Sequence, residues 1–344
     1  MRMRFSATLR RGHADAPFDA KLSDDRTLRA VFGLWIVAFA LKHVGASSDV
    51  AWHFRFLRDD LIPPHIVNLS GNAVALGLLY YHYLTRVAVE RRGFMILLAG
   101  FAVFIAALPL DLLNHHLYGL DITIWSIPHL MFFFGSTLAL IGLLNIWLQL
   151  APLGRWRTAY TVIFLTLLTD CAMFVLGQHE YGVLSLAAFR SGRPTASDDL
   201  LALAHGNVAG FATGWVPAWV YPIWMVLAGT LVLIGARRAQ PGRWTATIVA
   251  ALYLAYRGAG YILLVTAKFP PSFLPVMLLS AGVVLDLAAR WHWRSVLTTV
   301  GLLLAWYGSA AVVGRLTLMP TFAPATIWIV AVPLWGLVVR SRIS

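Results

Sequence analysis

Aspartate and histidine recur in the same order at two places in the first half of the chain. In each copy an Asp precedes a His by four residues, and a Pro-His dipeptide follows. Residues four apart lie on one face of a helix, so the Asp and the first His can converge on one ion. Proline is tolerated at a helix start, so the second His is expected to open the returning helix. These candidate ligands are Asp49, His53 and His65 in the first copy and Asp111, His115 and His129 in the second.

The donor types in this pattern indicate a metal ion held by imidazole and carboxylate groups. Cys171 is the only cysteine and lies in an apolar segment, which excludes an intrachain disulfide and a thiolate-rich metal site. Sulfur-free sites of this kind suit copper, zinc, iron or manganese. Neighbouring polar residues are expected to orient the ligands, and some belong to a weaker third copy of the pattern. They are Asp60, His116, Asp121, His179, Glu180 and His205.

The first copy resembles a copper-binding membrane subunit of the particulate methane and ammonia monooxygenases. In that family a transmembrane Asp-x-x-x-His, followed about a dozen residues later by His, binds copper near the periplasmic side, and Asp49, His53 and His65 match the pattern. The resemblance covers only the segment 48–71. It implies a copper site, oxidation of a small apolar substrate, and partner subunits in the membrane or periplasm. The second copy, the larger number of apolar segments and the lack of a soluble copper-binding domain depart from that family.

The composition predicts a lipid environment around these residues. Of 344 residues 59% are hydrophobic and only 12% are charged, more apolar surface than one soluble core of this size can bury. Apolar runs of about 20 residues, enough for a helix to cross a bilayer, recur along the chain. We therefore expect an all-α, polytopic membrane protein of ten transmembrane helices, near 29–48, 65–85, 93–114, 129–150, 157–178, 213–236, 244–267, 272–290, 295–314 and 324–340.

The basic residues predict the orientation of these helices. The net charge is +12, but the arginines gather before the first apolar segment and after the even-numbered ones, as expected of cytoplasmic segments rather than of a nucleic-acid surface. Both termini are therefore expected in the cytoplasm, with the inner membrane as the location and the Asp and His residues facing outward. We divide the chain into a cytoplasmic tail (1–28), the repeated helical hairpins (29–212) and the C-terminal transmembrane helices (213–344).

Among the charged residues inside the predicted helices, where charge is costly and usually has a partner, three are candidates for a role in function. Arg257 is expected to pair with Asp286 or, alternatively, with Asp170. Four histidines lie outside the repeated pattern, and we expect them only to cap helices or to bond lipid headgroups: His13, His43, His82 and His292.

The sequence leaves several functions open. A membrane metalloprotein with redox activity is the leading hypothesis, and copper is the preferred ion ahead of zinc or iron. A metal-dependent membrane hydrolase and a transporter or metal sensor without enzymatic activity are the alternatives. The repeated pattern could also be only a helix-capping turn inherited by duplication.

Overall fold

The regular structure of the described part of the chain is helical, without strands. The computed structural model describes residues 24–53, 63–118, 126–173, 220–267, 274–313 and 326. Its helices are α1 (Asp25–His53), α2 (Pro63–Thr85), α3 (Arg91–Tyr118), α4 (Ile127–Leu150), α5 (Arg155–Met173), α9 (Val220–Ala239), α10 (Thr245–Thr266), α11 (Val276–Arg290) and α12 (Ser295–Val313). The predicted all-α class is confirmed. A helix lies at each of the first nine predicted segments, whereas 324–340 lies outside the described residues except for Thr326.

Four of the described helices are long and apolar enough to cross a membrane. They span Asp25–Asp49, Arg91–Asn114, Ile127–Leu150 and Thr245–Thr266. A helix rises 1.5 Å per residue, so 20 residues cover about 30 Å, the thickness of the hydrocarbon core. The length and composition of these four helices are therefore those of membrane-spanning helices.

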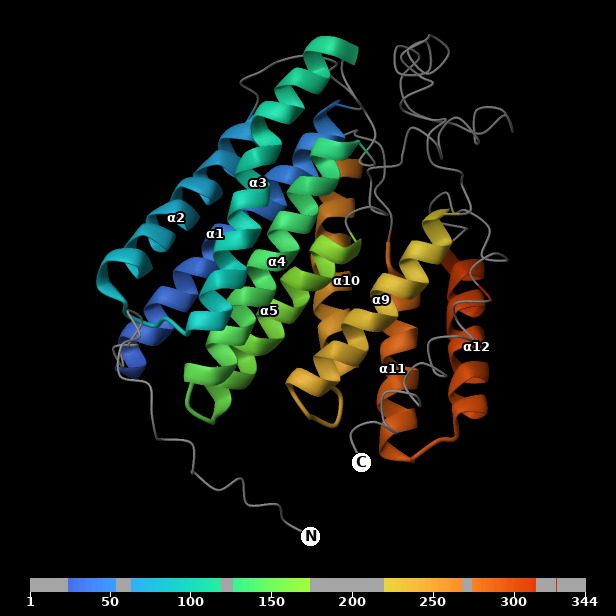
Figure 1. The fold of residues 1–344 in the computed structure, drawn as a ribbon. Coiled ribbons are helices and arrows are strands. Elements are labelled where there is room, and N and C mark those ends of the chain that lie inside the picture. The colour runs from blue at the N-terminus through green and yellow to red at the C-terminus, as the bar shows by residue number, and fades with distance from the viewer. Residues whose placement is uncertain are drawn as a thin grey trace.

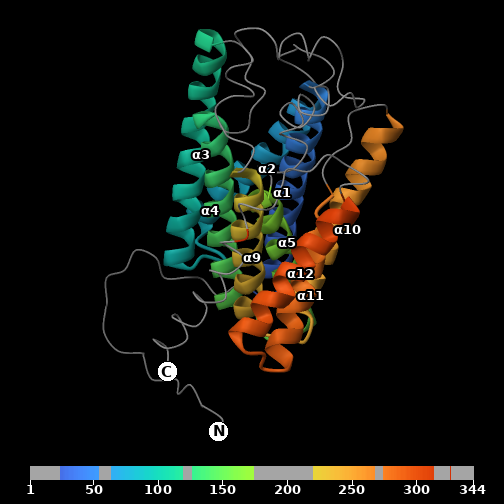
Figure 2. The same ribbon diagram turned by 90° about the vertical axis from the view of Figure 1, so that its right-hand side faces the viewer.

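The helices form two groups that meet at α5. The pairs α1/α2 and α3/α4 are antiparallel hairpins, and they stand together on one side of the molecule (Figure 1). Helices α9, α11 and α12 lie on the other side (Figure 1), which faces the viewer in the view turned by 90° (Figure 2). Helix α5 contacts α1 and α4 on one side and α9 and α10 on the other. A residue on α5 can therefore touch both groups.

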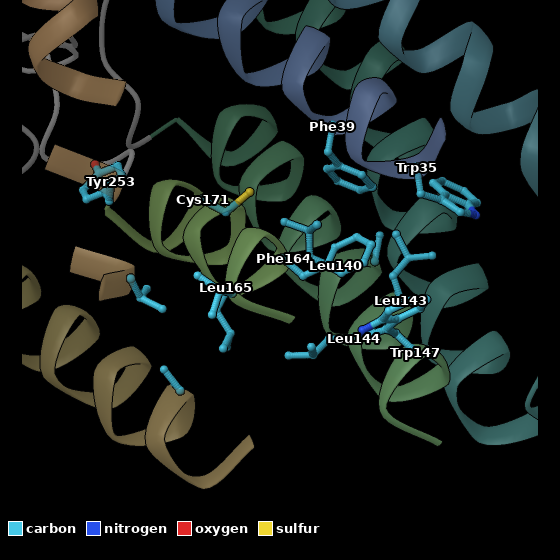
Figure 3. Packing of buried hydrophobic residues seen from close by; sticks show 14 of the residues in the cluster. Trp35, Phe39, Leu140, Leu143, Leu144, Trp147, Phe164, Leu165, Cys171 and Tyr253 are labelled. Atoms are coloured by element: carbon cyan, nitrogen blue, oxygen red, sulfur yellow. The ribbon is translucent and has the colours of Figure 1, made fainter. Parts of the chain in front are cut away.

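Large aromatic side chains fill the space between the first helices. Trp35, Phe39, Trp147 and Phe164 are fully buried where α1 packs against α4 and α5 (Figure 3). The ring of Phe32 lies 5.1 Å from that of Trp147 and 6.0 Å from that of Phe164. Lipid tails are as apolar as these residues, so close packing rather than escape from water holds such helices together.

The start of α1 is fixed by a polar cap. The backbone N–H of Thr27 donates to Asp24 Oδ1 at 2.6 Å. This bond and a second one from the Thr27 hydroxyl hold the pKa of the Asp24 carboxyl below its usual value. Helix α1 thus begins at Asp25, four residues before the first predicted segment, because the capping residue lies outside the apolar run.

Candidate functional site

Each of the first two hairpins places its Asp against the His of the returning helix. His65 Nε2 lies 2.9 Å from Asp49 Oδ1, and His129 Nε2 lies 3.5 Å from Asp111 Oδ1. Each Asp lies near the end of the first helix of its hairpin, and each His lies in the first turn of the second. All four side chains are partly exposed, at 20–35%. We call these contacts the outer Asp–His pairs.

The start of each returning helix positions its histidine. Helix α2 begins with two prolines, and His65 is its third residue. In α4, Pro128 occupies the first turn, and the backbone N–H of His129 donates to the hydroxyl of Ser126 at 3.4 Å. The expectation that each Pro-His opens a helix is confirmed, because proline fits the first turn, where its missing N–H costs nothing.

A glycine in the first hairpin sets the distance between its helices. A Cβ atom on Gly71 would lie 2.6 Å from the carbonyl oxygen of Ala38 and 2.8 Å from the backbone nitrogen of Lys42. These two residues lie 11 and 7 positions before Asp49, and Gly71 lies 6 after His65. The backbones touch here, so the contact fixes how far apart Asp49 and His65 stand two turns further along.

The second hairpin has the same contact at the corresponding positions. A Cβ atom on Gly135 would lie 2.7 Å from the carbonyl oxygen of Gly100 and 2.8 Å from the backbone nitrogen of Phe104. These residues again lie 11 and 7 positions before the Asp, here Asp111, and Gly135 again lies 6 after the His. The two hairpins therefore share a glycine contact and an Asp–His contact in the same register.

The remaining predicted ligands are only partly within the described residues. The backbones of His53 and His115 lie at the C-terminal ends of α1 and α3, but their side chains lie outside the described part. His116 is described and exposed on α3. The others lie outside the described residues: Asp60, Asp121, His179, Glu180 and His205. Within the described residues, no three or more His, Cys, Asp or Glu side chains are arranged to hold a metal ion.

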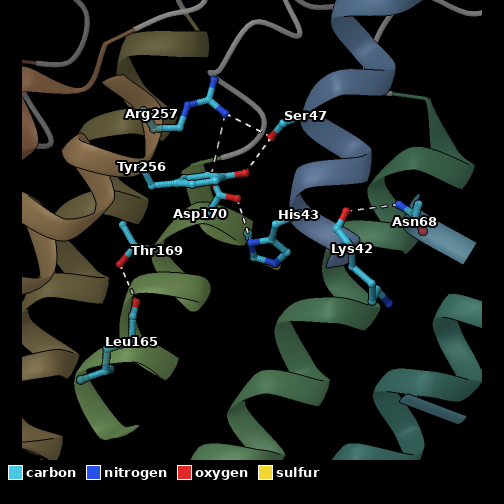
Figure 4. A network of polar contacts seen from close by, with 10 residues as sticks. Lys42, His43, Ser47, Asn68, Leu165, Thr169, Asp170, Tyr256 and Arg257 are labelled. Carbon is cyan, nitrogen blue, oxygen red and sulfur yellow. Dashed lines mark hydrogen bonds and ion pairs between the residues drawn. The ribbon is translucent and has the colours of Figure 1, made fainter. Parts of the chain in front are cut away.

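A second polar cluster lies between α1, α5 and α10 (Figure 4). His43 Nδ1 lies 2.8 Å from Asp170 Oδ2, and Arg257 NH1 lies 4.0 Å from Asp170 Oδ1. The same Arg257 nitrogen donates to Ser47 Oγ at 3.4 Å, and Ser47 Oγ lies 3.2 Å from the hydroxyl of Tyr256. His43, Asp170 and Arg257 are each less than 8% exposed. The acid and the guanidinium compensate each other's charge inside an apolar bundle, which an isolated charge could not tolerate.

The structure identifies the partner of Arg257, which the sequence left open between Asp286 and Asp170. Arg257 lies beside Asp170, whereas Asp286 forms an ion pair with Arg237 near the other end of the bundle. Asp286 also accepts hydrogen bonds from the backbone N–H and the hydroxyl of Thr247, at 2.8 and 2.7 Å. Asp286 thus joins the ends of α9, α10 and α11 and takes no part in the cluster of Figure 4.

Sequence reasoning missed the roles of one histidine and of the lysine before it. His43 is no simple cap, because its Nε2 lies 3.3 Å from Cys171 Sγ and its Nδ1 faces Asp170. The ammonium of buried Lys42 lies 3.5 Å from the centroid of the Phe104 ring, a cation–π contact. The one available signal was a Lys-His pair inside an apolar run.

His82 has the structural role expected of an isolated histidine. The indole N–H of Trp35 donates to its Nε2 at 2.9 Å, and its Nδ1 lies 2.8 Å from the carbonyl oxygen of Val87. An imidazole that accepts at one nitrogen and donates from the other is neutral, so both nitrogens of His82 serve to join α1 to the end of α2.

No protein-family model, curated protein or solved structure matches this chain.

Proposed function

We propose that the chain is a multi-pass protein of the inner membrane that binds a metal ion at the outer Asp–His pairs. The observation that carries the proposal is the repetition of the pair, in one register, on two successive hairpins. Two donors that bind one tetrahedral ion at about 2.0–2.1 Å lie about 3.3 Å apart. The separations of 2.9 and 3.5 Å bracket that value.

Each pair supplies two ligands, and the remaining histidine of each copy is the natural third. His53 and His115 follow their aspartates by one helical turn. Two imidazoles and one carboxylate with open positions form a set used by redox and by hydrolytic metal sites. Copper held there would supply redox chemistry, and we propose that the protein oxidises a small apolar or lipid substrate, together with membrane or periplasmic partner subunits. The aspartates would set the charge of the site and orient the imidazoles.

The arrangement in the membrane is part of the same proposal. About ten helices would cross the bilayer, with both termini in the cytoplasm and both Asp–His pairs on the periplasmic side. The arginines at the ends of the even-numbered segments support this orientation.

The test is the metal content of the full-length protein purified in detergent, after incubation with copper, zinc or iron and removal of excess ion. The variants are His65→Ala, His129→Ala and the double variant, and the control is His292→Asn, which changes an exposed histidine outside the pairs. We expect stoichiometric copper in the wild type and in the control, and none in the double variant. Loss of half the metal in each single variant would indicate two separate ions, whereas loss of all of it would indicate one shared centre.

The same measurement separates the alternatives. Specific retention of zinc instead of copper would favour a metal-dependent hydrolase, in which the ion lowers the pKa of a bound water. A wild-type protein that binds none of the three ions, or a double variant that binds as much as the wild type, would refute the metal site. Transport is the weaker alternative, because Asp286 is bonded to Arg237 and Thr247 and, among the described residues, does not continue the polar cluster of Asp170.

A further inference from the structure

Three side chains of the buried cluster have the arrangement of a nucleophile, a base and an orienting acid. Cys171 Sγ lies 3.3 Å from His43 Nε2, and the opposite ring nitrogen, Nδ1, lies 2.8 Å from Asp170 Oδ2. The thiol and the carboxylate therefore face the two nitrogens of one imidazole. In cysteine and serine hydrolases the same order of contacts lets the imidazole take the proton of the nucleophile while the acid fixes its tautomer.

The elements that bring these groups together hold them rigidly. His43 lies on α1, whereas Asp170 and Cys171 are neighbours on α5. Cys171 lies 128 positions after His43 in the sequence. One turn after His43, Ser47 binds both Arg257 and Tyr256 of α10. Asp170 is thus flanked by the guanidinium of Arg257, 4.0 Å from Oδ1, and by His43 Nδ1, 2.8 Å from Oδ2.

An ion pair needed only to compensate buried charge would not require the thiol. Asp170 and Arg257 already balance each other. His43 contacts Asp170 through Nδ1 and directs Nε2 to the only cysteine of the chain. The three groups are almost fully buried, at 7% exposure for His43, 4% for Cys171 and 2% for Asp170.

We propose that Cys171, His43 and Asp170 form an acyl-transfer site within the membrane. His43 lies six residues before Asp49, and therefore about 9 Å deeper along α1 at 1.5 Å per residue. A substrate that reaches this depth travels through lipid, so the acyl donor is an ester or thioester with a hydrocarbon chain. The proposal is independent of the metal site, because it uses none of the outer Asp–His pairs.

The reaction proceeds in two balanced steps. His43 Nε2 accepts the thiol proton, Cys171 sulfur forms a bond to the acyl carbon, and the bond from that carbon to the alcohol or thiol of the donor breaks. The leaving group takes the proton from His43, which yields a thioester on Cys171. Water, or a second hydroxyl or amine, then gives its proton to His43 and attacks the thioester, and the thiol is restored with that proton. Asp170 is a positioning residue that orients the imidazole and stabilises its cationic form.

The experiment uses full-length protein in detergent micelles and p-nitrophenyl decanoate as the acyl donor. Release of p-nitrophenolate and the intact mass of the protein are followed together, and the adduct is mapped by peptide analysis and treated with neutral hydroxylamine, which cleaves thioesters. We expect one decanoyl group on Cys171 of the wild type and none on Cys171→Ala. His43→Gln should slow the acylation at least about 100-fold, the usual contribution of a general base.

A matched control variant and a second reagent allow the proposal to be tested even if one variant is unstable. His82→Gln replaces a histidine that is equally buried but bonded to Trp35 and Val87, and it should acylate like the wild type. Alkylation of Cys171 by N-ethylmaleimide should be fast in the wild type and slower in His43→Gln and in Asp170→Asn. The proposal would be overturned if the folded wild type formed no adduct and released p-nitrophenolate no faster than Cys171→Ala. It would also be overturned if His43→Gln reacted at the wild-type rate with both reagents.

Discussion

A carboxylate buried in an apolar bundle costs several kcal/mol unless its oxygens are paired and its charge is compensated. Asp286 meets both conditions, since Arg237 supplies the charge and Thr247 supplies two hydrogen bonds. Asp170 meets only the second, since Arg257 and His43 lie within ion-pair distance of its oxygens. The two acids were equivalent in the sequence, but the first holds helix ends together, whereas the second faces a base and a nucleophile.

The Arg237 charge can be tested directly. Arg237→Gln removes the counter-charge of a fully buried acid, so we expect a loss of about 3 kcal/mol in the free energy of unfolding. The neighbouring Arg238 is exposed, and Arg238→Gln should change the stability by less than about 0.5 kcal/mol. Unfolding by guanidinium in detergent, followed by tryptophan fluorescence, provides the measurement. Equal effects of the two substitutions would show that the ion pair does not stabilise the protein.

Between elements, glycines decide how closely two helices pack. Gly71 and Gly135 have no side chain, so the backbone of the opposite helix lies directly against each of them. Each contact lies in the same hairpin as one of the outer Asp–His pairs. A packed interface of this kind cannot yield at one point without moving the whole hairpin, because backbone atoms are not flexible. The distance between Asp and His in each outer Asp–His pair therefore depends on the glycine contact of the same hairpin.

A methyl group added at Gly71 should show how far the stability depends on the close approach of the two helices. Gly71→Ala places a Cβ atom 2.6 Å from the Ala38 carbonyl oxygen, so α1 and α2 must separate. We expect thermal unfolding in detergent to reveal a destabilisation of about 1–3 kcal/mol, the usual cost of overpacking.

The control is on the same helix. A methyl group added at Gly77 would have no atom within 4 Å, and Gly77→Ala should be neutral or stabilising by up to about 1 kcal/mol, because alanine favours helix. If Gly71→Ala were as stable as Gly77→Ala, the close approach of α1 and α2 would not limit the packing.

For the whole molecule, the distribution of charge and the position of α5 have separate consequences. Basic residues gather at one end of the predicted helices, as the proposed orientation in the membrane requires. Helix α5 contacts both helix groups and carries Asp170 and Cys171, so the polar cluster exists only when the two groups are assembled.

The orientation can be measured with reporter fusions. A green fluorescent protein attached after Ser344 should fluoresce, because it folds in the cytoplasm. Alkaline phosphatase inserted within 183–200, between the predicted segments 157–178 and 213–236, should be active, because it folds outside. The same phosphatase inserted between Arg86 and Arg91 should be inactive. If alkaline phosphatase fused after Ser344 were active, the C-terminus would lie outside the cytoplasm, and the proposed arrangement would be refuted.

The sequence by itself determined the helices and the outer Asp–His pairs. Apolar runs and prolines mark helices regardless of what packs against them, and a hairpin between consecutive helices brings the end of one beside the start of the next. For that reason Asp49 met His65, and Asp111 met His129, as the repeated pattern indicated.

Only the tertiary structure decided the partners of the buried charges. His43 and Cys171 are 128 positions apart, and Ser47 and Arg257 are 210 positions apart. Hydropathy gives the depth of a residue in a helix but not the direction it faces or the helix that lies opposite. Arg257 therefore could not be assigned to Asp170 rather than Asp286 until the packing of α1, α5 and α10 was known, because that packing depends on the fit of glycines and aromatic side chains between helices.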